Sequence, residues 1–178
     1  MACTVSSQPR VVPSSVVEAV KFHRLDLLEE ALACPGVDVD HRDFSGNTGL
    51  YVAVALGLPA VVDMLVAAGA DPNTPCVSGQ TPVWRAAVSG SVPMLRTLLR
   101  AGGDANIRDA HGECALKALA CYGLGLPSDV EARVRELVAH PHTALDVRDS
   151  AGLTAEDAAR AKGNHALASI IADEVGAG

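Results

Sequence analysis

The sequence predicts an all-α solenoid, a row of short helix pairs stacked along one axis. The first observation is a glycine-centred turn, which recurs at Gly46, Gly79, Gly112 and Gly152 with spacings of 33, 33 and 40 residues. The second observation is that apolar residues recur at helical spacing after each turn. The third observation is composition, because 49% of the 178 residues are hydrophobic but only 3% are aromatic. A core of small aliphatic side chains suits closely stacked helices.

Each unit follows one local plan. Threonines (Thr48, Thr81 and Thr154) follow three of the turns and are placed to cap a helix. That short helix ends at a second glycine, eleven residues after the first, and a second helix follows. The apolar residues of the second helices are Val62, Leu65, Val66, Leu95, Leu98, Leu99, Val134, Leu137 and Val138. One unit cannot bury this face alone, so neighbouring units must stack.

Two motifs identify a family resemblance. Residues 79–87 read Gly-Gln-Thr-Pro-Val-Trp-Arg-Ala-Ala, and residues 69–73 read Gly-Ala-Asp-Pro-Asn. They resemble the Gly-x-Thr-Pro-Leu-His-x-Ala-Ala and Gly-Ala-Asp-x-Asn motifs of the ankyrin repeat. The resemblance covers residues 14–174 and implies helix-turn-helix units with projecting β-turn fingers. It also implies a concave face that binds protein partners.

The sequence departs from the repeat pattern in two ways. Tyr51, Trp84, Lys117 and Asp157 replace the signature histidine, so the bonding between finger and helix must differ here. The fourth unit is seven residues longer than each of the two units before it. We expect the helix-linking segment 121–129 to hold most of the excess, with residues 123–129 as a solvent-facing loop on the rim away from the fingers. Any remainder is expected in the turn at residues 140–143.

The domain organisation is expected to be one repeat domain of about five units, two of them caps. The approximate units are 14–42, 43–75, 76–108, 109–148 and 149–174. Residues 1–13 and 175–178 are expected to be tails, with 1–13 and 176–178 mobile. The chain is either a free-standing protein or the ankyrin region of a larger one.

Charge and cysteine content exclude several classes of protein. The 14 Lys and Arg against 21 Asp and Glu give a net charge of −7, which argues against binding to nucleic acid. Five irregularly spaced cysteines do not indicate a secreted disulfide scaffold, so we expect an intracellular protein, cytoplasmic or nuclear. Residues 50–70 are long and apolar enough to span a bilayer, but Asp63 lies near their centre. Two buried helices explain this stretch better, and no membrane insertion is expected.

The sequence shows no catalytic motif, and we expect neither enzyme activity nor a cofactor. There is no phosphate-binding loop and no Gly-x-Ser-x-Gly elbow. Cys114 follows His111 by three residues and could form a nucleophilic pair, but it occupies the place of a capping threonine, which favours a buried structural role. A metal site at His140, His142, Cys114 or Cys121 is the weaker alternative to a solvated turn.

We expect a partner to bind across the fingers and first helices of the central units. The candidate contact residues are Phe44, Ser45, Asn47, Val77, Ser78, Gln80, Trp84, Arg85, Ser89, His111, Glu113 and Tyr122. Phe44, Val77 and His111 recur at spacings of 33 and 34 residues. For Phe44, solvent exposure and packing against the adjacent finger both stay open. For Trp84, burial in place of the histidine and direct contact both stay open.

Other positions support further hypotheses. Arg42, Arg108 and Arg148 each precede a finger aspartate, and form either a basic row for a partner anion or local ion pairs. Asn73 and Asn106 match the turn asparagine that ankyrin proteins can have hydroxylated, with a purely structural role as the alternative. Phe22 and Leu56 share the place of Tyr122 near the end of a first helix.

The expected function is non-catalytic protein binding, as an adaptor or scaffold that is monomeric when free. The alternative is an inhibitor that occludes the active surface of a partner enzyme such as a protein kinase. That alternative rests on a resemblance in size to the small ankyrin inhibitors of cyclin-dependent kinases.

Overall fold

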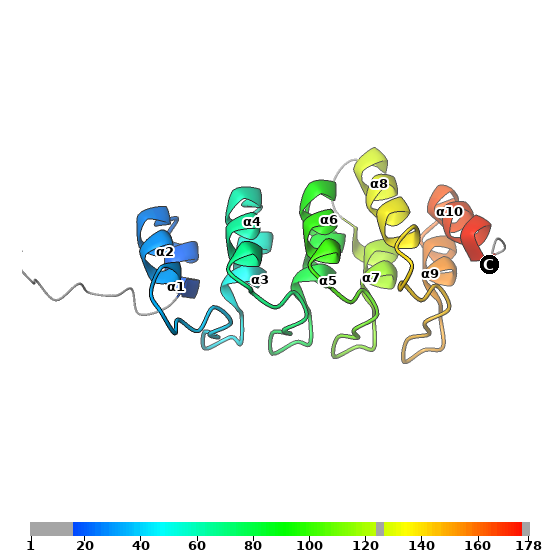
Figure 1. Cartoon of the computed structure of the whole chain (residues 1–178). Helices are drawn as coiled ribbons and strands as arrows, with labels where there is room; N and C mark the ends of the chain where they lie inside the picture. The colour runs from blue at the N-terminus through cyan, green and yellow to red at the C-terminus, as the bar shows by residue number, and fades with distance from the viewer. Residues whose placement is uncertain (1–15, 124–126, 176–178) are drawn as a thin grey trace, which may run out of the picture.

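The chain folds as a row of helix pairs, seen from the side in Figure 1. This computed structural model describes residues 16–123 and 127–175. The helices are α1 (Val16–Lys21), α2 (Leu25–Leu32), α3 (Gly49–Ala55), α4 (Pro59–Ala67), α5 (Pro82–Ser89), α6 (Val92–Arg100), α7 (Ala115–Tyr122), α8 (Pro127–Val138), α9 (Ala155–Ala161) and α10 (His165–Val175). The described residues contain these ten helices and no strand, so the predicted all-α solenoid is confirmed.

The helices form two layers. Helices α1, α3, α5, α7 and α9 contact one another in succession, and α4, α6, α8 and α10 form a second series. Between the pairs, turns that we call fingers project beyond the helices at the bottom of Figure 1. Neighbouring fingers are joined by backbone hydrogen bonds, from Val77 to Ser45 (3.4 Å) and from Ala110 to Ser78 (3.0 Å). Each finger is therefore held by its own unit and by the next one.

The core is aliphatic, as the composition predicts. Among its fully buried side chains are Leu28, Leu50, Leu65, Leu95, Leu98, Leu116, Leu119, Leu137, Leu167 and Ile171. The apolar stretch 50–70 divides into α3 and α4, and Asp63 is exposed and accepts a hydrogen bond from the Thr97 hydroxyl at 3.1 Å. None of the described helices is both long and apolar enough to cross a membrane.

Local sequence signals explain where the first helices begin. The hydroxyls of Thr48, Thr81 and Thr154 each accept a hydrogen bond from the backbone N–H three residues later, as an N-cap does. In the fourth unit, Cys114 occupies the N-cap position and makes no capping bond.

Two glycines are required for different reasons. Gly79 has a φ of +79°, and a Cβ there would lie 2.9 Å from the Ala110 nitrogen of the next finger. Gly90 has a φ of −82°, but a Cβ there would lie 2.7 Å from the Ala86 carbonyl oxygen. Gly79 thus permits both a left-handed turn and close finger stacking, whereas Gly90 permits a close backbone approach at the end of α5.

The prediction for the long fourth unit is wrong in part. Residues 127–129, expected in a loop, form the start of α8, which has 12 residues where α4 and α6 have nine each. Proline suits the first turn of a helix because its missing N–H would have no helical partner there, and Asp129 suits the positive end of the helix dipole. Residues 124–126 of the expected loop lie outside the described residues, as do residues 1–13 and 176–178 of the expected tails. Val175, assigned to a tail, is the last residue of α10.

Candidate protein-binding surface

The fingers present a row of exposed side chains. The Phe44 side chain has a relative exposure of 112% and Val77 of 80%, while Ser45, Ser78 and His111 are also exposed. Phe44 does not fold against the adjacent finger, so the first of its two interpretations is the correct one. Contiguous apolar patches of this kind are typical of protein interfaces, so Phe44 and Val77 stay candidate contact residues.

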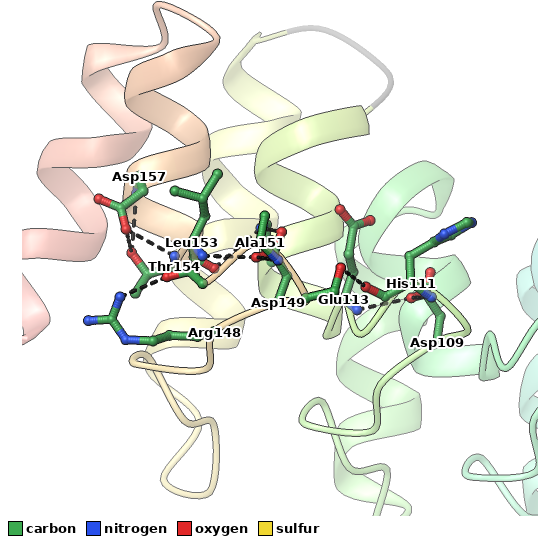
Figure 2. A network of polar contacts seen from close by, with 12 residues as sticks. Asp109, His111, Glu113, Arg148, Asp149, Ala151, Leu153, Thr154 and Asp157 are labelled. Atoms are coloured by element: carbon green, nitrogen blue, oxygen red, sulfur yellow. Dashed lines mark hydrogen bonds and ion pairs between the residues drawn. The ribbon is translucent and has the colours of Figure 1, made fainter.

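Aspartates hold three of the fingers in shape. The Oδ1 atoms of Asp43, Asp109 and Asp149 each accept two backbone N–H bonds, from the residues two and four positions later, at 2.8–2.9 Å. Figure 2 shows this arrangement for Asp109 and Asp149. In the finger that opens at Cys76, the sulfur instead contacts the Ser78 hydroxyl at 3.1 Å. Such bonds fix the turn before a partner arrives, which lowers the entropy cost of binding.

Lysines from a preceding helix reach two of these aspartates. Lys21 donates to Asp43 Oδ2 at 2.5 Å, and the buried Lys117 donates to Asp149 Oδ2 and to the Leu153 carbonyl. Burial opposes ionisation of Asp43, but hydrogen bonds from Lys21, Asn47 and Ser45 lower its pKa to about 2. Lys117 likewise lowers the pKa of Asp149. Both carboxylates are already neutralised within the protein.

The four residues in place of the signature histidine make four different kinds of contact. The Tyr51 hydroxyl donates to Gln80 Oε1 of the next finger at 2.9 Å, and burial raises the pKa of Tyr51 to about 12. Lys117 binds Asp149, and Asp157 forms a capping box with Thr154 (Figure 2). Trp84 is buried at 6% exposure against Val88 and Ala118, and its indole nitrogen has no hydrogen-bond partner in the described part of the chain. Tyr51 and Lys117 therefore tie their units to the next finger, whereas Trp84 packs against Ala118 in helix α7 of the next unit.

The polar row predicted beside the fingers is used inside the protein. Asn47 donates its side-chain amide to Asp43, Gln80 accepts from Tyr51, and Glu113 is buried at 7% exposure. Burial and the charge of Asp109 raise the pKa of Glu113, and the Tyr122 hydroxyl lies 3.5 Å from its Oε1. These three side chains are therefore bonded or covered within the stack, and their contact with a partner stays a prediction. The indole ring of Trp84 is likewise buried and does not form part of the exposed surface.

The first helices add a second set of exposed groups. Phe22, Leu56 and Tyr122 are exposed, at matching positions near the ends of α1, α3 and α7. Ser89 and Arg85 of α5 are half-buried, and the Ser89 hydroxyl donates to the Arg85 carbonyl at 3.3 Å. Phe22 and Leu56 were not among the candidate contacts, although their equivalence to Tyr122 was the signal that could have included them. We call Phe22, Phe44, Leu56, Val77, Arg85 and Tyr122 the finger-side surface.

Asn73 and Asn106 join neighbouring units through both ends of their amides. Asn73 donates to the Gly102 carbonyl at 3.0 Å and accepts from the Asp104 N–H at 2.7 Å. Asn106 makes the same pair of bonds to His142 and Ala144. Asp40, 33 residues before Asn73, accepts from the Asp71 N–H in the same manner, a role that sequence reasoning missed. The geometry supplies a structural role for both asparagines, across units rather than within one turn.

The remaining candidates gain little support. The buried Cys114 has its pKa raised by burial, which disfavours the nucleophilic thiolate, while His111 is exposed on the finger. The rings of His140 and His142 meet edge to face at 5.8 Å, and among the described residues no group of three potential ligands could hold a metal ion. Arg148 donates to the Gly152 carbonyl of its own finger at 2.8 Å. Arg42 and Arg108 are exposed and form no ion pair with a described residue.

Comparison with known proteins agrees with this architecture. A profile of ankyrin repeats in three copies matches residues 16–109, and the chain belongs to the ankyrin repeat family. A 49-residue segment is 45% identical to Protein fem-1 homolog A of Rattus norvegicus and 43% identical to Protein fem-1 homolog A-A of Mus musculus. That segment is 28% of this chain and only 7% of either relative. Ankyrin repeats generally mediate protein–protein interaction, and the family is typically non-catalytic.

Proposed function

We propose that this chain is a non-catalytic protein-binding module, with repeat units as delimited above, that acts as an adaptor or scaffold through its finger-side surface. The observation that carries the proposal is the exposure of both phenylalanines. Phe22 and Phe44 lie outside the aliphatic core and in solvent, at 72% and 112% exposure. Exposed apolar groups cost free energy in water, and a protein partner recovers it by covering them.

Rigidity supports the same proposal. The aspartate-bonded fingers and their lysine ties set Phe44 in place without a partner. Binding then orders few groups, so more of the contact energy appears as affinity. The free chain is proposed to be monomeric and intracellular. The free thiols of Cys34, Cys76, Cys114 and Cys121 support a reducing compartment.

The test is an affinity purification from cells of the source organism with three baits. These are the wild type, Phe44→Ala, and Leu25→Ala as a matched control that removes an exposed apolar side chain at the start of α2. We expect the wild type and Leu25→Ala to retain the same proteins and Phe44→Ala to lose them. A hot-spot aromatic typically contributes about 2 kcal/mol or more, so retention should fall well over tenfold. Equal recovery by all three baits contradicts the proposal.

The alternative role, inhibition of a partner enzyme such as a protein kinase, shares the surface and differs in outcome. Once a partner is recovered, its activity is measured with and without a saturating amount of this chain. Loss of activity supports the inhibitor, and unchanged activity supports the adaptor or scaffold.

A further inference from the structure

Arg85 is an unusual residue for its position in the repeat. It follows the signature position, where the other units have Val52, Ala118 and Ala158, all buried. An arginine there places a guanidinium at a site that the fold otherwise fills with small apolar side chains. Its Nε atom is buried and has no hydrogen-bond partner among the described residues.

A buried guanidinium elsewhere in the chain is bonded. Arg133, fully buried, donates to the Ala87 carbonyl at 2.7 Å and to the Asp129 carbonyl at 3.3 Å. Arg85 forms no comparable bond and no ion pair within the described chain. Nε is the only nitrogen of the Arg85 side chain that is buried without a hydrogen-bond partner. The two terminal nitrogens form no hydrogen bond to a described residue and are exposed to solvent. Removing half of a charged group from water without a partner is unfavourable.

No ion pair joins Arg85 to a carboxylate of the described residues. On the same side, Asp43 is paired with Lys21 and Asp149 with Lys117. The cations that lower the pKa of Glu113 are Lys117 and His111, not Arg85. The charge of Arg85 acts to lower the pKa of Tyr51, so the guanidinium lies near the Tyr51 side chain. Tyr51 in turn donates a hydrogen bond to Gln80, in the finger that carries Val77.

We propose that Arg85 binds the side-chain carboxylate of an aspartate or glutamate of the protein partner, whose neighbouring apolar side chains cover Val77 and Phe44. The proposal rests on the proposed function and adds the chemistry of the partner. A guanidinium with two open nitrogens matches the two oxygens of a carboxylate. One carboxylate neutralises the single positive charge of Arg85. A doubly charged group on the partner would keep one negative charge, which the net negative charge of this chain would repel.

The test begins with a phage-displayed library of short random peptides selected on the wild-type chain. We expect enrichment of peptides with an Asp or Glu flanked by apolar residues. The best peptide is then synthesised with its acid and with the matching amide. The amide should bind the wild type about tenfold more weakly, a typical coupling for a close charge pair. On Arg85→Gln, acid and amide peptides should bind equally.

Controls separate this inference from the proposed function. Arg135→Gln removes an exposed cation of α8 and should keep the preference for the acid peptide. Because the acid-to-amide change is made in the peptide, the result on the wild type is independent of how well Arg85→Gln folds. Peptides that need Phe44 but show no preference for an acid overturn the role of Arg85 and leave the binding surface standing. Failure to select any peptide that depends on Phe44 or Arg85 overturns both.

Discussion

At the scale of single residues, the junctions between units depend on one repeated position. Asp40, Asn73 and Asn106 all accept a backbone N–H from the next unit, but only the asparagines also donate to a carbonyl there. Burial raises the pKa of Asp40, and the charges of Asp71 and Asp38 add to it, although the Asp71 N–H lowers it. The carboxylate at the first junction is therefore less favourable than an amide.

Asp40→Asn should raise stability at pH 7 by about 1 kcal/mol, since the amide keeps the acceptor, loses the charge and gains a donor. A raised pKa in the folded state means that Asp40 loses its stabilising contribution as pH rises through that pKa. The gain should vanish below pH 3.8, where the wild-type carboxyl is also neutral. Urea denaturation of both chains at the two pH values checks this. A gain that is equal at both would contradict the electrostatic cause.

Arg85→Val should stabilise the free chain while removing the proposed anchor. Valine occupies the equivalent position 52, so the side chain fits the fold and no half-buried charge remains. We expect a gain of about 1 kcal/mol, as is common when a functional residue is replaced by one that suits its environment. Thermal unfolding followed by circular dichroism measures it. A clearly lower melting temperature would show that Arg85 serves the fold instead.

At the scale of elements, the fingers of Asp43 and Asp149 combine local hydrogen bonds with an ion pair to a lysine of a preceding helix. Asp43 illustrates this arrangement, because Oδ1 holds its own turn and Oδ2 accepts from Lys21 of α1. These bonds connect the finger that carries Phe44 to helix α1, so a turn of few residues is held in a fixed conformation.

Lys21→Met should make the chain less stable at neutral pH and reduce its acid sensitivity. A carboxyl with a lowered pKa contributes stability above its unfolded value, and this contribution is lost as pH falls through the folded value. For Asp43 that window runs from 3.8 down to about 2. The stability difference between wild type and variant should shrink across this window, and high salt should reduce it at neutral pH because Lys21 is partly exposed. Denaturation series at several pH values test both effects, and a constant difference would exclude the ion pair as the cause.

At the scale of the whole molecule, stability depends on stacking between neighbours. The second-helix layer is continuous from α4 to α10, and the first-helix layer from α1 to α9. In such a stack each unit is stabilised by its interfaces, so a defect in a central unit weakens the whole row.

Leu98→Ala tests this dependence. Leu98 is fully buried in α6, and its truncation should cost about 2–5 kcal/mol because the site cannot fully collapse. Leu25→Ala, at an exposed leucine, should change stability by far less. Chemical denaturation gives both values. Similar small losses for the two variants would argue against a packed central interface.

Sequence alone determined the features that depend on residues close together in the chain and on the spacing of the repeats. The spacing of the glycine turns and the capping threonines predicted the units and the first helices, because turns and caps are made by hydrogen bonds within a few residues. Tertiary structure alone decided which polar groups stay free. Trp84, Gln80 and Glu113 resemble surface residues in the sequence but are covered or bonded by units about 30 residues away, and Arg85 is left unpaired at a position where other units bury valine or alanine. These outcomes rest on how neighbouring units stack, and the energy of a contact between units is not encoded in either unit alone.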